Sequence, residues 1–404
     1  MVGTLSERIL GGDAGMFIDR EVDRAYVHDG TGVLTLDAWR RMGEKGPARP
    51  ETLSILFDHI APANATVTAN LQAELREFAR AYGIFFSEVG EGIAHQVMSE
   101  GRVLPGEMVV GADSHTCTLG AFGAFATGVG ATDMAAIWTS GMTWLKVPPT
   151  IAVRLSGELL APAEAKDAAL TYIACLGMDG ATYQALEFVG EGAGTLTMSD
   201  RLTMSNLAVE SGAKAGLFYA DRVTCEYLAG FGKKVVPQVP AGCCYARTIS
   251  IDLPEIVPVV AVPPRVDSIK PVSELEGLPI DQVFVGTCTN GRYADLERFA
   301  WLVAGKKVKV RTIVVPASGS ILARGIESGI IRDIIAAGCV VGSPGCGPCL
   351  GAHMGVIGEG EVCLSTANRN FRNRMGVGGE IYLGSVGTAA ATALAGVLTR
   401  PGGA

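Results

Sequence analysis

Apolar residues along the chain follow two alternating patterns. The segment NLQAELREFARAYG has apolar residues at helical spacing, and Gly83 at its end favours termination of a helix. These apolar residues are Leu71, Leu75, Phe78 and Tyr82. The next segment, IFFSEV, is a short apolar run of the kind that forms a buried strand. A helix followed by a strand is therefore predicted here.

The second half of the chain repeats this alternation most plainly. Strands are predicted at 282–286, 308–318 and 339–343, and helices at 294–305 and 321–338. Regular alternation of strands and helices indicates right-handed βαβ units around parallel sheets. The predicted fold class is therefore α/β, with parallel sheets covered by helices.

Two proline-rich segments suggest linkers between compact units. They are WLKVPPT at 144–150 and VPVVAVPPRVDSIKPV at 257–272. A chain of 404 residues also exceeds the length at which a single core keeps growing. Three domains are therefore predicted: an α/β/α domain at 1–147, an α/β domain at 148–264 and a second α/β/α domain at 265–404.

Composition and charge narrow the possible partners. Apolar residues make up 48% of the chain and charged residues 18%, as in an ordinary folded protein. The net charge of -8 argues against binding to nucleic acid or to an anionic membrane surface. The first residues lack the pattern of a secretory signal, and no run of 18 apolar residues occurs. We expect a soluble cytoplasmic protein with a small-molecule partner.

Polar residues gather where the predicted strands end. In parallel α/β sheets, ligands bind at the carboxyl ends of the strands, so these positions are the first candidates for a site. They are Asp58 and His59 after SILF; Asp113, Ser114 and His115 after MVVGA; Cys288 and Asn290 after QVFVG; Cys346 and Cys349 after CVVGS; and Asn368 and Arg369 after EVCLST.

Cysteines raise the question of a metal. In the cytosol ten cysteines are more plausibly thiols or ligands than disulfides, and six lie among apolar or small neighbours that suggest core packing: Cys175, Cys225, Cys243, Cys244, Cys339 and Cys363. Cys346 and Cys349 form a CxxC pair in a Gly-Pro loop, and Cys288 follows another strand of the same predicted sheet. Spacing alone leaves three possibilities: a three-cysteine iron–sulfur site, a zinc site, or unrelated buried or redox thiols.

Five segments, taken together and in order, resemble the large subunit of the aconitase-like hydro-lyases, the group of 3-isopropylmalate dehydratase and homoaconitase. They are FDHIAP, GADSHTCTLGAFGAFATGVGATD, VGTCTNGRYADL, PGCGPCLG and STANRNFRNRMG. The resemblance covers the chain from end to end. It implies one [4Fe-4S] cluster held by Cys288, Cys346 and Cys349, with one iron that no cysteine ligates. It also implies dehydration and rehydration of a hydroxy acid without net redox.

The same resemblance implies roles for further residues. His59, oriented by Asp58, matches the proton donor, whereas on sequence alone this Asp-His pair also suits a simple cap of the following segment. Asp113, Ser114 and His115 match a second catalytic group, in which His115 is expected to pair with Glu187. Substrate carboxylates are expected to bind at four residues: His28, Asn368, Arg369 and Arg374. Asn290 is expected beside the cluster, and Cys117 is expected to be a bystander.

The resemblance also implies a missing part. Full-length aconitases end in a swivelling domain that supplies a serine base and a substrate arginine, and LTRPGGA at the end of this chain leaves no room for it. A separate small subunit carrying that domain is therefore expected. The leading substrate is 3-isopropylmalate, with homocitrate or homoaconitate as the alternative. Two less favoured hypotheses are a cluster-free RNA-binding protein and a protein with a structural zinc site.

Overall fold

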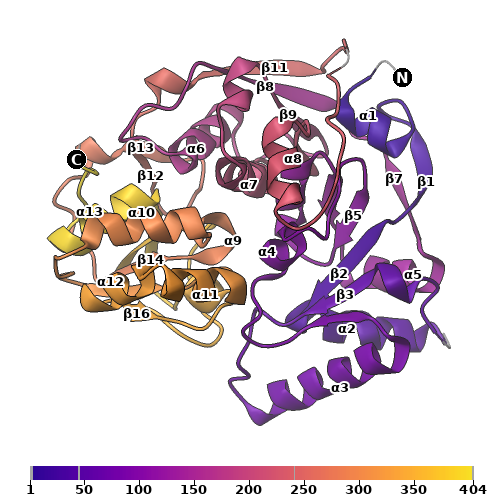
Figure 1. Cartoon of the computed structure of the whole chain (residues 1–404), viewed down its shortest axis with the longest axis horizontal. Coiled ribbons are helices and arrows are strands. Elements are labelled where there is room, and N and C mark those ends of the chain that lie inside the picture. Colours follow the sequence, from indigo (N-terminus) through magenta and orange to yellow (C-terminus); the bar gives the residue numbers. More distant parts are fainter. Residues whose placement is uncertain (1–2, 44–45, 241, 403–404) are drawn as a thin grey trace.

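The computed structural model describes residues 3–43, 46–240 and 242–402. Three large sheets follow one another along the chain, and Figure 1 shows them as three regions around a common centre. The indigo and purple N-terminal region lies on the right, the second region lies above, and the orange C-terminal region lies on the left. The predicted α/β class with helices against largely parallel sheets is confirmed.

The first sheet has five parallel strands in the order β4-β3-β2-β5-β6. Helix α3 confirms the predicted helix, because Leu75 and Phe78 are buried and Gly83 ends it with a φ of 65°. The strands are β2 Arg24–His28, β3 Leu53–Leu56, β4 Phe85–Ser87, β5 Met108–Gly111 and β6 Phe125–Gly128, and the helices are α2 Asp29–Arg41, α3 Thr66–Tyr82, α4 Ala94–Ser99 and α5 Ala131–Ser140.

The second sheet has four parallel strands in the order β10-β9-β8-β11. Its strands are β8 Thr150–Ser156, β9 Ala185–Val189, β10 Ala215–Phe218 and β11 Arg247–Asp252, and its helices are α6 Ala165–Leu176, α7 Met198–Leu207 and α8 Arg222–Ala229. The N-terminal helix α1, Leu5–Leu10, also reaches this region, because its first amides donate to Glu187 of β9.

The third sheet has seven strands in the order β13-β12-β18-β17-β14-β15-β16. Five of them are parallel to one another, whereas β12, at one side, pairs antiparallel with both β18 and β13. The strands are β12 Val259–Ala261, β13 Ile269–Pro271, β14 Gln282–Val285, β15 Arg311–Val314, β16 Val340–Val341, β17 Val362–Ser365 and β18 Glu380–Leu383. The helices are α9 Thr287–Asn290, α10 Tyr293–Val303, α11 Gly319–Glu327, α12 Ile330–Ala336 and α13 Val386–Ala395.

Three expectations about these elements were wrong. The single helix expected at 321–338 is two helices, because Gly329 between them adopts a left-handed φ of 85°. The linker expected at 144–150 holds the end of β7, Met142–Lys146, which pairs antiparallel with β1, Phe17–Glu21. The linker expected at 257–272 holds β12 and β13 of the third sheet. The division at 147 and 264 stays a prediction.

Cysteine burial also differs from the expectation. Cys339 and Cys363 are buried, but Cys175 and Cys244 are exposed. Cys225 and Cys243 are half-buried, so four of the six cysteines assigned to core packing lie at or near the surface. Cys175 and Cys225 lie in helices α6 and α8, and Cys243 and Cys244 lie in a loop, so apolar or small neighbours in the sequence did not indicate burial. Within the described part of the chain, no helix is long and apolar enough to cross a bilayer.

Candidate active site

Loops from the first and third sheets meet at the centre of the molecule. The amide of Cys346 donates to the Asp58 carbonyl at 2.8 Å, and its sulfur lies 3.8 Å from Nδ1 of His59. On the other side, the guanidinium of Arg369 lies 3.5 Å from the Ser114 hydroxyl. Residues separated by about 250 positions or more in the sequence therefore form one group.

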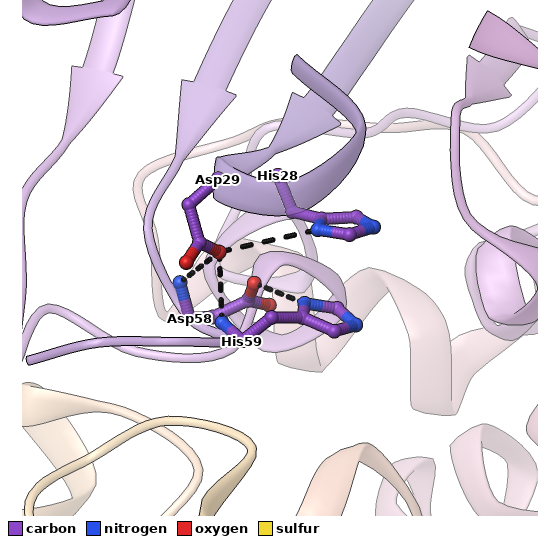
Figure 2. Close-up of side chains that lie close together, drawn as sticks. All are labelled: His28, Asp29, Asp58 and His59. Atoms are coloured by element: carbon purple, nitrogen blue, oxygen red, sulfur yellow. Dashed lines mark hydrogen bonds and ion pairs between the residues drawn. The ribbon is translucent and has the colours of Figure 1, made fainter. Parts of the chain in front are cut away.

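Asp58 and His59 form a tight ion pair after β3 (Figure 2). Oδ1 of Asp58 lies 2.6 Å from Nδ1 of His59, and Oδ2 accepts from the first amide of α4, on Ala94, at 2.7 Å. Burial alone would lower the pKa of His59, but the Asp58 carboxylate raises that pKa to about 9. His59 is therefore an imidazolium at neutral pH, whose Nδ1 contacts Asp58 and whose Nε2 lies 3.5 Å from Oδ2 of Asp113.

Asp29 supports the loop that carries this pair. Its carboxylate accepts from the amides of Asp58, His59 and Ile60 at 3.3, 2.9 and 2.8 Å. Figure 2 shows Asp29 above the loop, with its carboxylate toward the amides of Asp58 and His59. Asp29 therefore caps this loop, whereas Asp58 both caps the start of α4 and orients His59.

His28 stacks on His59 and differs from it in charge. The ring centroids are 3.6 Å apart and the planes differ by 17°. Nδ1 of His28 accepts from the Gly30 amide at 3.1 Å. Burial, followed by the neighbouring His59 charge, lowers the pKa of His28 to about 4. One charged and one neutral imidazole therefore lie face to face.

By distance, the four side chains in Figure 2 could also hold a metal ion, since one ligand atom from each of them lies within 4.8 Å of the others. However, the Asp29 oxygens already accept from backbone amides, and Asp58 accepts from His59 and Ala94. His59, as an imidazolium, also carries a proton on both ring nitrogens, so neither offers a lone pair to a metal. The group therefore fits proton transfer better than cation binding.

Asp113, after β5, lies among several imidazoles. Its Oδ1 is 3.1 Å from Nε2 of His95, and its Oδ2 is 3.5 Å from Nε2 of His59 and 3.8 Å from Nε2 of His28. Burial would raise the pKa of Asp113, but these histidines hold it well below its usual range. His95 was missed in the sequence because it lies inside α4 and not at a strand end.

His115 does not pair with Glu187, contrary to the expectation. Its Nε2 lies 2.8 Å from Oε1 of Glu210, which also accepts from Nε of Arg369 at 2.7 Å. Glu187 instead accepts from the amides of Leu5 and Ser6 and from two tyrosine hydroxyls, Tyr219 and Tyr245. The side chain of Glu187 is directed to the start of α1, whereas Glu210 follows α7 and reaches the site.

Buried amides and a guanidinium surround the three candidate ligand cysteines. Asn206 and Asn368 point their amide nitrogens at the Cys288 sulfur, at 3.1 and 3.5 Å. Arg374 lies 3.7 Å from the Cys349 sulfur and donates to the Cys349 carbonyl at 3.0 Å. Such N–H donors are typical around metal-bound thiolates, because they stabilise negative charge on sulfur.

The arrangement of these thiols fits a cluster of several metal ions. Cys346 and Cys349 share one turn, in which the Cys349 amide donates to the Cys346 carbonyl at 3.2 Å, and besides burial the Cys288 thiol raises the pKa of both. Among the described residues, however, they do not form a set of donors that all lie within 4.8 Å of one another, as one ion would require. Ligands of a single zinc ion lie closer together than that spacing. The donor set therefore fits an iron–sulfur cluster better than zinc.

Two further predicted residues lie beside this group. Asn290 donates to Asp295 at 3.0 Å and lies 3.4 Å from the Thr203 hydroxyl, at the base of the Cys288 loop. Cys117 is buried and donates to the Asn206 carbonyl at 3.4 Å. Burial raises the pKa of Cys117 to about 12, so this residue is a packed neutral thiol. Asn206 was missed in the sequence, where it looks like any polar residue of a helix.

Comparisons with known proteins give a consistent result. The model of the aconitase family (aconitate hydratase) matches residues 7–277 and 268–396. The chain is 50% identical to a probable methanogen homoaconitase large subunit of Methanosarcina mazei, covering 94% of this chain and 98% of that protein. It is 44% identical to a 3-isopropylmalate dehydratase large subunit of Elusimicrobium minutum, covering 99% of each. A solved structure, the holo-form of aconitase X from Thermococcus kodakaraensis, matches with a TM-score of 0.50 and 15% identity, covering 90% of this chain and 86% of that one.

Proposed function

We propose, because this chain belongs to the aconitase family, that it is the large subunit of a hydro-lyase that isomerises 3-isopropylmalate and 2-isopropylmalate. The reaction removes water from the hydroxy acid and adds it back at the neighbouring carbon. The convergence of the Asp58–His59 pair with the Cys346 loop carries the proposal. It brings a protonated imidazole next to a candidate metal ligand.

Membership of the family implies an iron–sulfur cluster. In this proposal it is one [4Fe-4S] cluster held by Cys288, Cys346 and Cys349, with one iron that has no cysteine ligand. When bound, such a cluster supplies a Lewis acid that binds the hydroxyl and a carboxylate of the substrate. The amides of Asn206 and Asn368 and the guanidinium of Arg374 stabilise the thiolates.

His59 is the general acid of the proposed dehydration. Its Nδ1 is fixed by Asp58 at 2.6 Å, so the proton on Nε2 is the one available to the departing hydroxide. Asp113 lies 3.5 Å from that nitrogen and stabilises the imidazolium. His28 stacks on His59 as a neutral imidazole, so it adds no second positive charge beside the acid.

Arginines bind the carboxylates of the substrate in this proposal. Arg369 is held by Glu210 at 2.7 Å and remains one quarter exposed, so its other nitrogens are available to a ligand near Ser114. Arg374 lies beside Cys349 and is placed for a second carboxylate. Asn368 and His28 complete the expected substrate contacts.

A separate small subunit is required to complete this site. The relatives cited above are named large subunits and are covered almost completely by this chain, which implies a small-subunit partner. We propose that the partner is a swivel-domain subunit that supplies the base for proton removal. His59 then serves as acid on one side of the substrate, and the partner serves as base on the other.

Homoaconitase activity is the second candidate. The 50% identity to one probable methanogen homoaconitase large subunit favours it, but two other relatives named homoaconitase large subunits, at 44 and 43%, are no more similar than those named 3-isopropylmalate dehydratase, at 43 to 45%. The two candidates share the reaction and the residues described above and differ in the substrate side chain. A direct comparison of 3-isopropylmalate with homocitrate is therefore the decisive measurement.

The test is anaerobic reconstitution with iron and sulfide, addition of the small subunit from the same organism, and an ultraviolet assay of the conjugated alkene with each acid. The large subunit alone serves as the control and is expected to be inactive. Activity with 3-isopropylmalate supports the first candidate, and activity with homocitrate alone replaces it with the second. Zinc without iron in the anaerobically purified protein, or no alkene from either acid, would overturn both.

A further inference from the structure

A buried lysine joins the second region of the molecule to the candidate active site. Lys166 lies in the first turn of α6, and only 1% of its surface is exposed. Its ammonium donates to the carbonyl of Thr366 at 2.9 Å and also to the carbonyl of Ala367. These two carbonyls directly follow β17 and belong to the third region. The lysine thus crosses between two parts of the fold.

Two loops beside the candidate ligand Cys288, the one after β14 and the one after β17, are connected through Thr366 and its neighbours. Asn368 and Arg369 come immediately after the two carbonyls, and they contact the Cys288 sulfur and Glu210 respectively. The Thr366 hydroxyl accepts from the Gly286 amide at 3.0 Å and lies 3.2 Å from the Gly286 carbonyl, at the start of the Cys288 loop. A shift of the Thr366 carbonyl would therefore displace residues on both sides of the site.

Carbonyl oxygens are the hydrogen-bond acceptors of the Lys166 ammonium. Within the described ranges no carboxylate oxygen forms an ion pair with its ammonium, and Asp167 next to it accepts from the amides of Val259 and Glu164 instead. An unpaired ammonium is costly to bury, so a compensating negative charge is expected nearby. Burial lowers the pKa of Lys166 to about 7, and Cys288 is the strongest influence in the opposite direction, followed by the carboxylates of Asp167 and Asp295 and then by Cys349.

We propose, on the basis of the function proposed above, that Lys166 is a positioning residue of the active site. Its two hydrogen bonds fix the end of β17 and so place Asn368 and Arg369. Its ammonium binds the carbonyls that directly precede Asn368, whose amide lies 3.5 Å from the Cys288 sulfur, so its positive charge offsets the negative charge of a thiolate-held cluster. The same side chain therefore serves substrate binding and the electrostatics of the cluster.

The test compares Lys166→Met with Lys166→Arg in the reconstituted two-subunit enzyme. Lys307→Met is the matched control, because Lys307 also donates to a backbone carbonyl, that of Ala336, but is exposed. Two quantities are measured: the reduction midpoint potential of the cluster without substrate, followed by electron paramagnetic resonance, and KM separately from kcat.

For Lys166→Met we expect a more negative potential, because loss of a nearby positive charge disfavours reduction, and a KM raised about tenfold. Lys166→Arg should restore the potential and only part of the KM, and Lys307→Met should change neither. A folded Lys166→Met protein with full iron content and both quantities unchanged would overturn the proposal.

Lys166→Gln keeps the test decisive if the methionine variant does not fold. Its amide retains two N–H donors for the carbonyls but carries no charge, so KM should stay near that of the wild type while the potential still becomes more negative. An unchanged potential in Lys166→Gln contradicts the electrostatic role. The potential is measured without substrate, so failure of the proposed substrate assignment affects only the KM comparison and is recognised separately.

Discussion

Two buried glutamates show how different surroundings give the same residue type different tasks. Glu210 contacts His115 at 2.8 Å and Arg369 at 2.7 Å, and although burial acts against it, the hydrogen bond with His115 and the charge of Arg369 lower its pKa. Glu187 accepts only from neutral donors, the amides that begin α1 and two tyrosine hydroxyls, and burial raises its pKa to about 7. Charged partners therefore distinguish the active-site region from the region around Glu187.

The strands of the first sheet and those of the second sheet also differ in what their polar residues contact. The loops after β3 and β5 face loops of the third region, where His59 lies 3.8 Å from the Cys346 sulfur and the Arg369 guanidinium lies 3.5 Å from the Ser114 hydroxyl. Glu187 of β9 instead ties α1 to the second sheet through hydrogen bonds. A polar residue on or after a parallel strand is thus a candidate for chemistry only where charged groups from another element face it.

The largest effect in the charged region is expected from Cys288→Ser. Loss of one of three proposed ligands should abolish both the brown colour and turnover, because serine is a poor ligand for iron in such clusters. Iron content and activity after anaerobic reconstitution are the measurements. Cys117→Ser serves as the matched control and should retain both. A full complement of iron in the Cys288 variant would refute the ligand assignment.

Asp58→Asn should reduce kcat by about 10²- to 10⁴-fold, the usual contribution of a positioned acid. The amide cannot hold His59 as an imidazolium through the 2.6 Å contact, so less of the acid form is available. Steady-state kinetics with the cluster content held equal provides the measurement. A kcat within threefold of the wild type would remove His59 from the role of general acid.

Glu210→Gln should reduce kcat/KM by about 10- to 100-fold, as expected for lost charge-assisted hydrogen bonds to His115 and Arg369. Combining this change with Arg369→Gln in a double-mutant cycle tests the coupling. Effects that simply add would show that Glu210 does not act through Arg369.

Glu187→Gln should leave kcat within about twofold of the wild type and alter only stability. The raised pKa of Glu187 means that the folded state keeps a proton that the unfolded state releases between pH 4.5 and about 7. Its contribution to stability is therefore lost as the pH rises through that window. Above it, the variant should be more stable by up to about 3 kcal/mol, and the difference should vanish toward pH 4.5.

Thermal midpoints of the wild type and the Glu187 variant at pH 5 and pH 8, measured under anaerobic conditions, test this expectation. Equal differences at both values would show that Glu187 titrates normally. A strong loss of activity would return Glu187 to the active site.

Sequence patterns predicted the α/β fold and the strand ends because local periodicity determines both. Asp58, Asp113 and the three cysteines directly follow strands or their short turns, and parallel sheets bring such positions to one edge. His95, Asn206, Glu210 and Lys166 lie in helices or in the turn after α7, where their contacts depend on how the three regions pack. That packing leaves no pattern in the local sequence. For this reason the expected partner of His115 was Glu187, whereas the structure shows Glu210.

Cys346 receives its backbone support from Asp58, far away in the sequence and in another sheet. A fragment limited to residues 257–402 would carry all three proposed ligands but lack that carbonyl, as well as the ammonium of Lys166. We therefore expect cofactor insertion to depend on completion of the tertiary structure. The colour of the bound cofactor can thus report, during refolding, the moment at which the N-terminal and C-terminal parts have docked.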